Sequence, residues 1–312
     1  MARKKKGRPV NGILVLDKPA GITSNRALQK VKRLFEAQKA GHTGSLDPLA
    51  TGVLPICLGE ATKLSHYLLD ARKRYRARCI LGITTTTGDS EGDVLEQSDI
   101  PEFDKSRLIS LLENFKGSQS QTPPMYSALK HNGRPLYEYA RKGIEIERKS
   151  RQITIFELNL LNYHWQTDAQ SGQAFIEIEV LCSKGTYIRS LCEDIGSALG
   201  CGAHISVLRR LEAEPFILSQ AVTLEQLEAQ ADFYAREQLL QDTDAAIHSF
   251  SRIDLNDSEK DLIAHGHSIA CNAFEQAVET HINYRLYFNN TLIALAILDE
   301  NKNLKPKRLL FL

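Results

Sequence analysis

One acidic side chain stands in a segment whose glycines and prolines predict a shaped loop. Asp47 lies within Gly41–Lys63, which reads GHTGSLDPLATGVLPICLGEATK. Pro48 restricts Asp47 to extended backbone geometry, and Gly44 and Gly52 allow tight turns on either side. Binding and catalytic residues concentrate on loops of this kind, so Asp47 is a candidate catalytic carboxylate. The alternative is an ordinary surface turn in which Asp47 accepts a backbone N–H.

Other chemistries find no support in the motifs. The glycines of this loop are followed by Ser45, Val53 and Glu60, so they lack the spacing of a P-loop. Thr87–Asp93 is acidic like a calcium loop, but it has neither EF-hand spacing nor the terminal glutamate and is predicted to be a turn. There is no HExxH, no GxSxG and no Cys/His cluster, which argues against zinc hydrolases and serine esterases.

Composition indicates an ordinary globular protein. Of the 312 residues, 42% are hydrophobic and 25% are charged. No apolar run approaches the roughly 20 residues of a membrane span, and the basic N-terminus is not followed by the apolar segment of a secretory signal. We therefore expect a cytoplasmic protein without a membrane partner. The six cysteines show no CxxC pair, and we expect reduced, mostly buried thiols: Cys57, Cys79, Cys182, Cys192, Cys201 and Cys271.

Charge is unevenly distributed along the chain although the net charge is only +1. Basic residues concentrate in four segments, which are 3–8, 72–78, 130–151 and 302–308. Such segments on a nearly neutral protein favour binding of a polyanion along one face, which makes nucleic acid a candidate partner. Solvated surface charge is the alternative for any single segment.

Periodicity predicts an α+β fold with a mixed, largely antiparallel sheet. In Lys73–Leu81 the residues Tyr75, Ala77 and Cys79 alternate with arginines, as in a strand with one basic face. Strands are also predicted at 13–16, 53–58, 153–161, 175–182, 284–288 and 291–298, and helices at 25–37, 61–69, 105–115, 188–199 and from Thr223. Thr23 or Ser24 can cap the first of these helices, and Gly200 can supply the C-cap of the helix at 188–199.

Two segments differ in character from this core. Residues 121–143 mix proline, glycine, tyrosine and basic residues, which indicates a long loop with a short helix that contacts a ligand. Near residue 250 the pattern changes to short strands around an Asn-Asn turn. We therefore predict a catalytic domain at 1–250 and a small β-rich domain at 251–312.

Six segments in the same order resemble the TruB family of tRNA pseudouridine synthases. They are Leu16–Asn25, Gly41–Lys63, Lys73–Tyr75, Gln121–Lys130, Cys182–Arg189 and Gly200–Leu211. The resemblance implies a pseudouridine synthase fold, with residues 121–151 as a mobile thumb-like insertion. It also implies a β-barrel-like PUA-type domain at the C-terminus. The implied activity is an isomerase (intramolecular transferase) reaction, which converts the T-loop uridine at tRNA position 55 to pseudouridine without metal, organic cofactor or energy source.

The resemblance also assigns roles to particular residues. Asp47 is the catalytic aspartate, which assists glycosidic bond cleavage by attack on the base, by attack on the sugar or by abstraction of a sugar proton. Arg189 matches its ion-pair partner, and an arginine beside a carboxylate lowers its pKa. Tyr75 matches the tyrosine that stacks on the target base and helps remove the carbon-bound proton. Because the strand alternation separates the side chain of Tyr75 from Arg74 and Arg76, we expect these two arginines to contact phosphates on either side of it.

Four further residues match substrate-binding positions. His42 matches the histidine that fills the stack vacated by the flipped uridine, and base flipping is required for chemistry on a stacked base. Tyr187 and Leu208 match positions that line the base pocket; without the resemblance both would be core residues. Lys18 matches an N-terminal motif.

The expected partner is tRNA, bound through its T-stem loop and, by the C-terminal domain, through its acceptor stem. No obligate protein partner is expected, and a monomer is the default. Two rival hypotheses remain. One is a non-catalytic tRNA-binding or folding chaperone on the same scaffold, against which the joint presence of Asp47, Tyr75 and Arg189 argues. The other is a nucleotide-dependent RNA enzyme, against which the missing P-loop argues.

Overall fold

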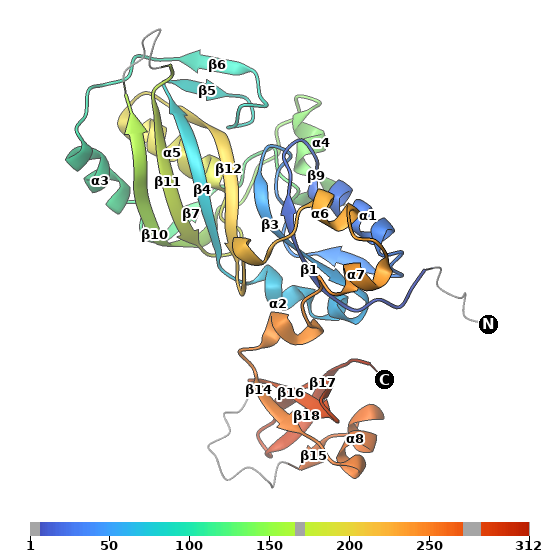
Figure 1. Cartoon of the computed structure of the whole chain (residues 1–312). Helices are drawn as coiled ribbons and strands as arrows, with labels where there is room; N and C mark the ends of the chain where they lie inside the picture. The colour runs from blue at the N-terminus through green and yellow to red at the C-terminus, as the bar shows by residue number, and fades with distance from the viewer. Residues whose placement is uncertain (1–6, 166–171, 271–281, 312) are drawn as a thin grey trace.

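Two β-sheets organise the computed structural model, which describes residues 7–165, 172–270 and 282–311 (Figure 1). The larger sheet has nine strands in the order β1-β3-β12-β4-β11-β10-β7, with β2 paired to β3 and β13 paired to β12. Its pairs are antiparallel except β3 with β12, which are parallel. The predicted α+β class with a mixed, largely antiparallel sheet is confirmed.

The strands of the larger sheet are β1 (Gly12–Lys18), β2 (Ala40–His42), β3 (Thr51–Leu58), β4 (Lys73–Leu81), β7 (Gly117–Gln121), β10 (Arg151–His164), β11 (Phe175–Cys182), β12 (Ala203–Ala213) and β13 (Phe216–Ile217). The α-helices of this part are α1 (Ser24–Leu34), α2 (Ser65–Leu69), α3 (Lys105–Glu113), α4 (Leu136–Ala140), α5 (Ile188–Leu199), α6 (Leu224–Glu228) and α7 (Phe233–Glu237). Short 3-10 helices are η1 (Gly59–Lys63), η2 (Leu218–Gln220) and η3 (Thr243–Ile247).

Local signals define where two helices begin and end. The side chain of Thr23 accepts a hydrogen bond from the backbone N–H of Arg26 and caps α1, as its position in the sequence predicts. Gly200 ends α5 in the left-handed conformation at φ 84°, the C-cap that was predicted. The helix predicted at 61–69 is instead the 3-10 helix η1 followed by the short helix α2.

Helix α5 covers one face of the large sheet and forms its core with β4, β11 and β12 (Figure 1). Buried side chains in this layer include Cys79, Ile178, Leu191 and Ile195. The described cysteines are free and buried, as predicted: Cys57, Cys79, Cys182, Cys192 and Cys201. Cys271 lies outside the described residues.

The arginines of β4 lie on the sheet face opposite α5. Arg74, Arg76 and Arg78 form ion pairs with the glutamates of neighbouring strands, at 2.6 to 3.4 Å: Glu157, Glu177, Glu179 and Glu212. The two-residue period of the strand turns them away from Tyr75, whose side chain is buried on the helix side. The expected separation of Tyr75 from Arg74 and Arg76 is confirmed, and their contact with phosphates stays a prediction.

Two hairpins extend from the large sheet. One consists of β5 (Ile83–Thr85) and β6 (Val94–Gln97), and the other of β8 (Lys130–His131) and β9 (Arg134–Pro135), which precedes α4. The second hairpin and α4 form the segment that was predicted to be a long loop with a short helix.

The second sheet forms around its own apolar core, below the large sheet in Figure 1. Its order is β14-β16-β17-β18-β15, and α8 (Asp257–Ala264) packs near β15 and β18. The strands are β14 (Ser251–Asp254), β15 (Ile269–Ala270), β16 (Asn283–Phe288), β17 (Thr291–Leu298) and β18 (Asn303–Leu309). Arg285 of this sheet pairs with Asp244 of η3 at 2.9 Å, which ties the two parts together. None of the helices described is long and apolar enough to cross a membrane.

Strand β12 was not predicted, although it lies at the centre of the large sheet. On this strand the charged Arg210 is 1% exposed, whereas the apolar Val207 is 51% exposed. A prediction from apolar/polar alternation would therefore assign these two residues to the wrong faces of the sheet. Tertiary contacts, rather than local periodicity, determine this strand.

Gly52 provides a test of the packing between β3 and β12. Its φ is +102°, and a Cβ at this position would lie 2.1 Å from the backbone oxygen of Arg210. We expect Gly52→Ala to lower the free energy of unfolding by about 3 kcal/mol, because the clash adds to the cost of positive φ. Chemical denaturation measures this. Gly41→Ala in the same segment is the control, since its Cβ would have no neighbour within 4 Å. Equal losses in both variants would contradict this account.

Candidate active site

The loop that carries Asp47 joins β2 to β3 and is tied to the surrounding structure by hydrogen bonds. The buried Ser24 hydroxyl accepts from the N–H of Leu46 at 2.7 Å and donates to its carbonyl at 3.0 Å. The N–H of Gly21 donates to the carbonyl of Pro48 at 2.9 Å. The loop is therefore anchored on both sides of Asp47, as a preorganised carboxylate requires.

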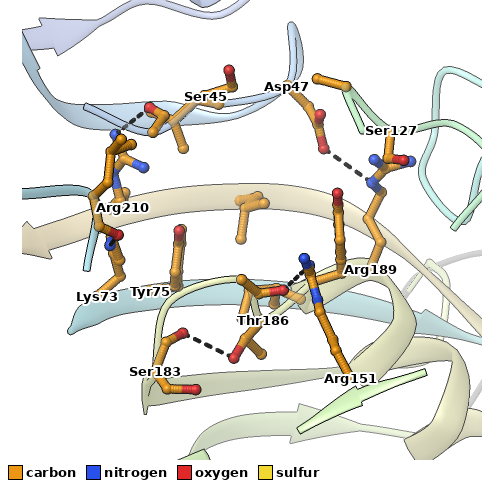
Figure 2. A pocket seen from close by; sticks show the side chains of 18 residues that line it. Ser45, Asp47, Lys73, Tyr75, Ser127, Arg151, Ser183, Thr186, Arg189 and Arg210 are labelled. Carbon is orange, nitrogen blue, oxygen red and sulfur yellow. Dashed lines mark hydrogen bonds and ion pairs between the residues drawn. The ribbon is translucent and has the colours of Figure 1, made fainter. Parts of the chain in front are cut away.

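Asp47 forms an ion pair with Arg189 at the start of α5. Arg189 Nε lies 3.0 Å from Asp47 Oδ2, and Figure 2 shows the two side chains pointing toward one another. The remaining guanidinium nitrogens donate to the carbonyls of Thr87, at 2.8 Å, and Tyr126, at 2.6 Å. Since Arg189 is only 4% exposed, its orientation is determined by these partners.

The net pKa direction of Asp47 differs from the expectation. Burial raises the pKa of Asp47 above its ordinary value, and the nearby carboxylate of Asp89 raises it further; the positive charge and hydrogen bond of Arg189 oppose this. The expectation that the arginine leaves the carboxyl with a lowered pKa is wrong in net direction, because desolvation is the larger effect. Arg189 limits the rise and orients the carboxylate.

Asp47 opens onto a cavity of about 270 Å³. Of the seven residues predicted for the site, five line this cavity: Asp47, Tyr75, Tyr187, Arg189 and Leu208. They come from the loop before β3, from β4, from the start of α5 and from β12. The structure thus brings together residues that lie far apart in the sequence.

Three of these side chains contribute apolar surface to the cavity. Tyr75 and Leu208 are 9% and 7% exposed, on the paired strands β4 and β12. The guanidinium carbon of Arg151 lies over the ring of Tyr187, 4.8 Å from the ring centroid. The side-chain amide of Gln121 accepts from the N–H of Tyr187 at 2.8 Å and donates to its carbonyl at 3.0 Å. A flat apolar wall next to a carboxylate suits a planar ligand such as a base.

Lys18 lies behind the site rather than in the cavity. Its ammonium is fully buried and donates to the carbonyls of Pro19 and Ile22 at 2.8 Å and of Pro48 at 3.4 Å. Burial lowers the pKa of Lys18 to about 8, although the Asp47 carboxylate acts in the opposite direction. Lys18 therefore supports the loop directly after Asp47.

His42 also lies outside the cavity lining. It is half-buried in β2, and its Nδ1 is buried without a hydrogen-bond partner among the residues described. Burial, and secondarily the charge of Arg210, lower the pKa of His42, which favours the neutral ring. A neutral imidazole is compatible with stacking in an RNA fold.

Several site residues were not predicted from the sequence. The turn at Thr87–Asp93 places Asp89 Oδ2 3.7 Å from Arg189 Nη1, and Asp89 is 3% exposed. Lys73, Arg151 and Arg210 line the cavity. Lys73 and Arg151 lie in segments that were noted as basic, whereas Arg210 does not, and only the tertiary structure brings the three to the site. In the part of the chain that is described, no group of three or more His, Cys, Asp and Glu side chains could hold a metal ion.

The fold is similar to that of chains from two solved assemblies. A chain of an H/ACA RNP bound to a substrate RNA containing 2′-deoxyuridine aligns with a TM-score of 0.71 at 22% identity, covering 100% of this chain and 92% of that one. A chain of a Cbf5-Nop10-Gar1 complex aligns with a TM-score of 0.71 at 23% identity, covering 99% and 91%. At these identities the likeness shows the fold.

Sequence comparison identifies the family. Residues 32–188 match the TruB family pseudouridylate synthase N-terminal domain, and residues 189–248 match the tRNA pseudouridylate synthase B C-terminal domain. The tRNA pseudouridine synthase B of Photobacterium profundum is 45% identical, over 99% of this chain and 98% of its own length. That of Chromohalobacter salexigens is 46% identical, over 99% and 97%. The chain belongs to the TruB family of pseudouridylate synthases.

Lys18 offers a test of the buried support behind Asp47. A lysine whose pKa is lower in the folded than in the unfolded state makes stability rise with pH between those two values. We therefore expect the free energy of unfolding of wild type to increase relative to Lys18→Met by up to about 3 kcal/mol between pH 8 and 10.5. Denaturation at several pH values measures the difference. Lys142→Met, at an exposed position, is the control; a flat difference for Lys18→Met would contradict the burial of a shifted ammonium.

Proposed function

We propose that this chain is a tRNA pseudouridine synthase that isomerises the T-loop uridine at position 55. Family membership supports the activity, and the observation that carries the site assignment is the Asp47–Arg189 ion pair at an apolar cavity with Tyr75, Tyr187 and Leu208. A cavity of this kind accepts a single base extruded from its stack.

The reaction balances without any co-reactant. The bond between C1′ and N1 of uridine breaks, a bond between C1′ and C5 forms, the C5 proton leaves and N1 gains a proton. Substrate and product are isomers, so no oxidant or energy source is needed. Asp47, held by Arg189, assists the cleavage by attack on the base, by attack on the sugar or by abstraction of a sugar proton.

Tyr75 and Tyr187 support the proposal through their position in the cavity. In the proposed complex Tyr75 stacks on the target base and Leu208 bounds the pocket beside it. His42 fills the space that the base leaves in the RNA, although it does not line the cavity. Lys18 acts indirectly by holding the Asp47 loop.

The segment at residues 121–151 is the proposed closing element over the RNA. Its carbonyl at Tyr126 accepts from Arg189, and Ser127 lines the cavity, so movement of this segment reaches the site. Its exposed basic side chains have no ion-pair partner among the described residues: Lys130, Arg134, Arg141, Lys142 and Lys149. They suit the phosphates of a T-stem.

The remaining assignments extend this proposal to the whole chain. Residues 1–250 form the catalytic domain, and residues 251–312 form a PUA-like domain that contacts the acceptor stem. We propose that the protein acts in the cytoplasm as a monomer without an obligate protein partner. The chaperone hypothesis differs in one respect: it predicts RNA binding without isomerisation.

Replacement of the carboxylate tests the activity. Asp47→Asn should abolish pseudouridine formation in a T-stem-loop transcript while the dissociation constant for the RNA stays within about threefold, because the amide keeps the shape but not the charge. Product analysis after nuclease digestion and a filter-binding titration measure the two effects. Asp99→Asn, at an exposed position, is the matched control. Full activity of Asp47→Asn would refute the assignment, and binding without product in wild type would favour the chaperone.

The salt dependence of binding tests the RNA-facing surface. Each phosphate contact releases counterions, so the affinity should fall steeply with salt. Replacing Arg141, Lys142 and Lys149 together by glutamine should reduce the slope of log K against log[salt] by about 2. Arg78→Gln is the control, because Arg78 already pairs with Glu177 on the face of the large sheet that lies opposite α5. An unchanged slope in the triple variant would exclude this segment as a phosphate-binding surface.

A further inference from the structure

Arg210 is a fully buried arginine that lines the cavity on the side away from Arg189. Its side chain is 1% exposed, and Figure 2 shows it beside Tyr75 and Lys73. In the antiparallel pairing of β12 with β4, Arg210 lies directly opposite Tyr75. Residues opposite each other in such a pair project to the same sheet face, so the two side chains share the cavity side.

The guanidinium of Arg210 binds both stems of the Asp47 loop. Its Nε donates to the carbonyl of Val53 at 2.6 Å, and Nη2 donates to the carbonyl of Gly44 at 3.4 Å. Gly44 precedes Asp47 and Val53 follows it. One side chain therefore contacts the chain on each side of the carboxylate, and it lines the cavity next to the phenol of Tyr75.

No carboxylate pairs with Arg210 among the described residues, which is unusual for a buried charge. A buried cation is costly without compensation, and the two carbonyls that accept from Arg210 are weaker partners than a carboxylate. The charge thus remains available to a group in the cavity. The groups that face Tyr75 are Arg210 from β12, Cys182 from β11, and Asp47 from its loop, with Lys73 on its own strand.

We propose that Arg210 is a positioning residue of the reaction, which holds the Asp47 loop against β4 and orients the phenol of Tyr75 toward the bound base. The role of Arg210 in the reaction rests on the function proposed above. Its position next to Tyr75 is independent of that function. Arg210 acts through these two groups and need not touch the RNA.

The chemistry of the last step explains why a cation is useful at this place. Once C1′ is bonded to C5, the C5 proton must leave. The Tyr75 phenol first gives its proton to water, and the phenolate then takes the C5 proton and becomes the phenol again, while N1 gains a proton from water. Burial raises the pKa of Tyr75, and the neighbouring Arg210 opposes this rise. The thiol of Cys182 remains protonated at neutral pH because burial raises its pKa to about 11. Arg210 is therefore a cation suited to stabilise the phenolate.

A double-mutant cycle tests the coupling in the full-length protein. We expect Arg210→Lys to lower kcat on a T-stem-loop transcript about 30-fold with KM within threefold, and to cost only about fivefold in a Tyr75→Phe background, where support of the Asp47 loop is the role that remains. Arg209→Lys is the matched control, because Arg209 lies on the other face of the same strand and pairs with Asp17 at 2.7 Å. Independent, multiplicative losses for Arg210→Lys and Tyr75→Phe would overturn the proposal.

A measurement without RNA separates this proposal from the proposed function. With 13Cζ-labelled tyrosine, the Tyr75 resonance, identified by its loss in Tyr75→Phe, should titrate at higher pH in Arg210→Gln than in wild type. Should Arg210→Gln not fold, the Arg210 Nε resonance is compared between wild type and Tyr75→Phe, and it should shift. An unchanged titration, or an unchanged Nε resonance, overturns the proposal. An active Asp47→Asn would instead refute the function and leave this contact standing.

Discussion

The site depends on the buried guanidinium of Arg189. It connects three segments that are distant in sequence, since it pairs with Asp47 and donates to the carbonyls of Thr87 and Tyr126. Arg189 is 4% exposed, and removing Asp47 would leave its buried charge without that partner, so the contacts of Arg189 favour keeping these segments together. The orientation of the carboxylate is therefore a property of the fold and exists before any RNA binds.

The same arrangement balances two opposing electrostatic demands. The low dielectric of an apolar cavity strengthens the electrostatic interactions of an ionised carboxylate. Burial also raises the pKa of Asp47, however, and so favours its protonated form. Arg189 opposes this on one side of the cavity, and the ammonium of Lys18 opposes it from behind the loop. Arg210 supplies positive charge on the other side, next to Tyr75. The cavity thus places one carboxylate among several cations.

Local features of the fold followed from the sequence, whereas long-range contacts did not. The cap at Thr23, the left-handed Gly200 and the alternation around Tyr75 depend on neighbouring residues, and each was predicted. Asp47, Tyr75 and Arg189 were found through motif resemblance, and the structure places them in one cavity. Asp89 was assigned only to a turn, because its approach to Arg189 spans residues far apart along the chain. Arg210 was missed because a buried arginine breaks the pattern that marks a strand.

The parallel pairing of β3 with β12 has a consequence for how the protein is made. Strand β12 lies between β3, next to Asp47, and β4, which carries Tyr75, but it follows both far along the chain. Until Ala203–Ala213 has been synthesised, the two walls of the cavity have no strand to hold them in register. A nascent chain therefore completes this cavity late, when β12 is added between β3 and β4. Ribosome-bound fragments that end before this strand are without a site, however much of the sheet they have already formed.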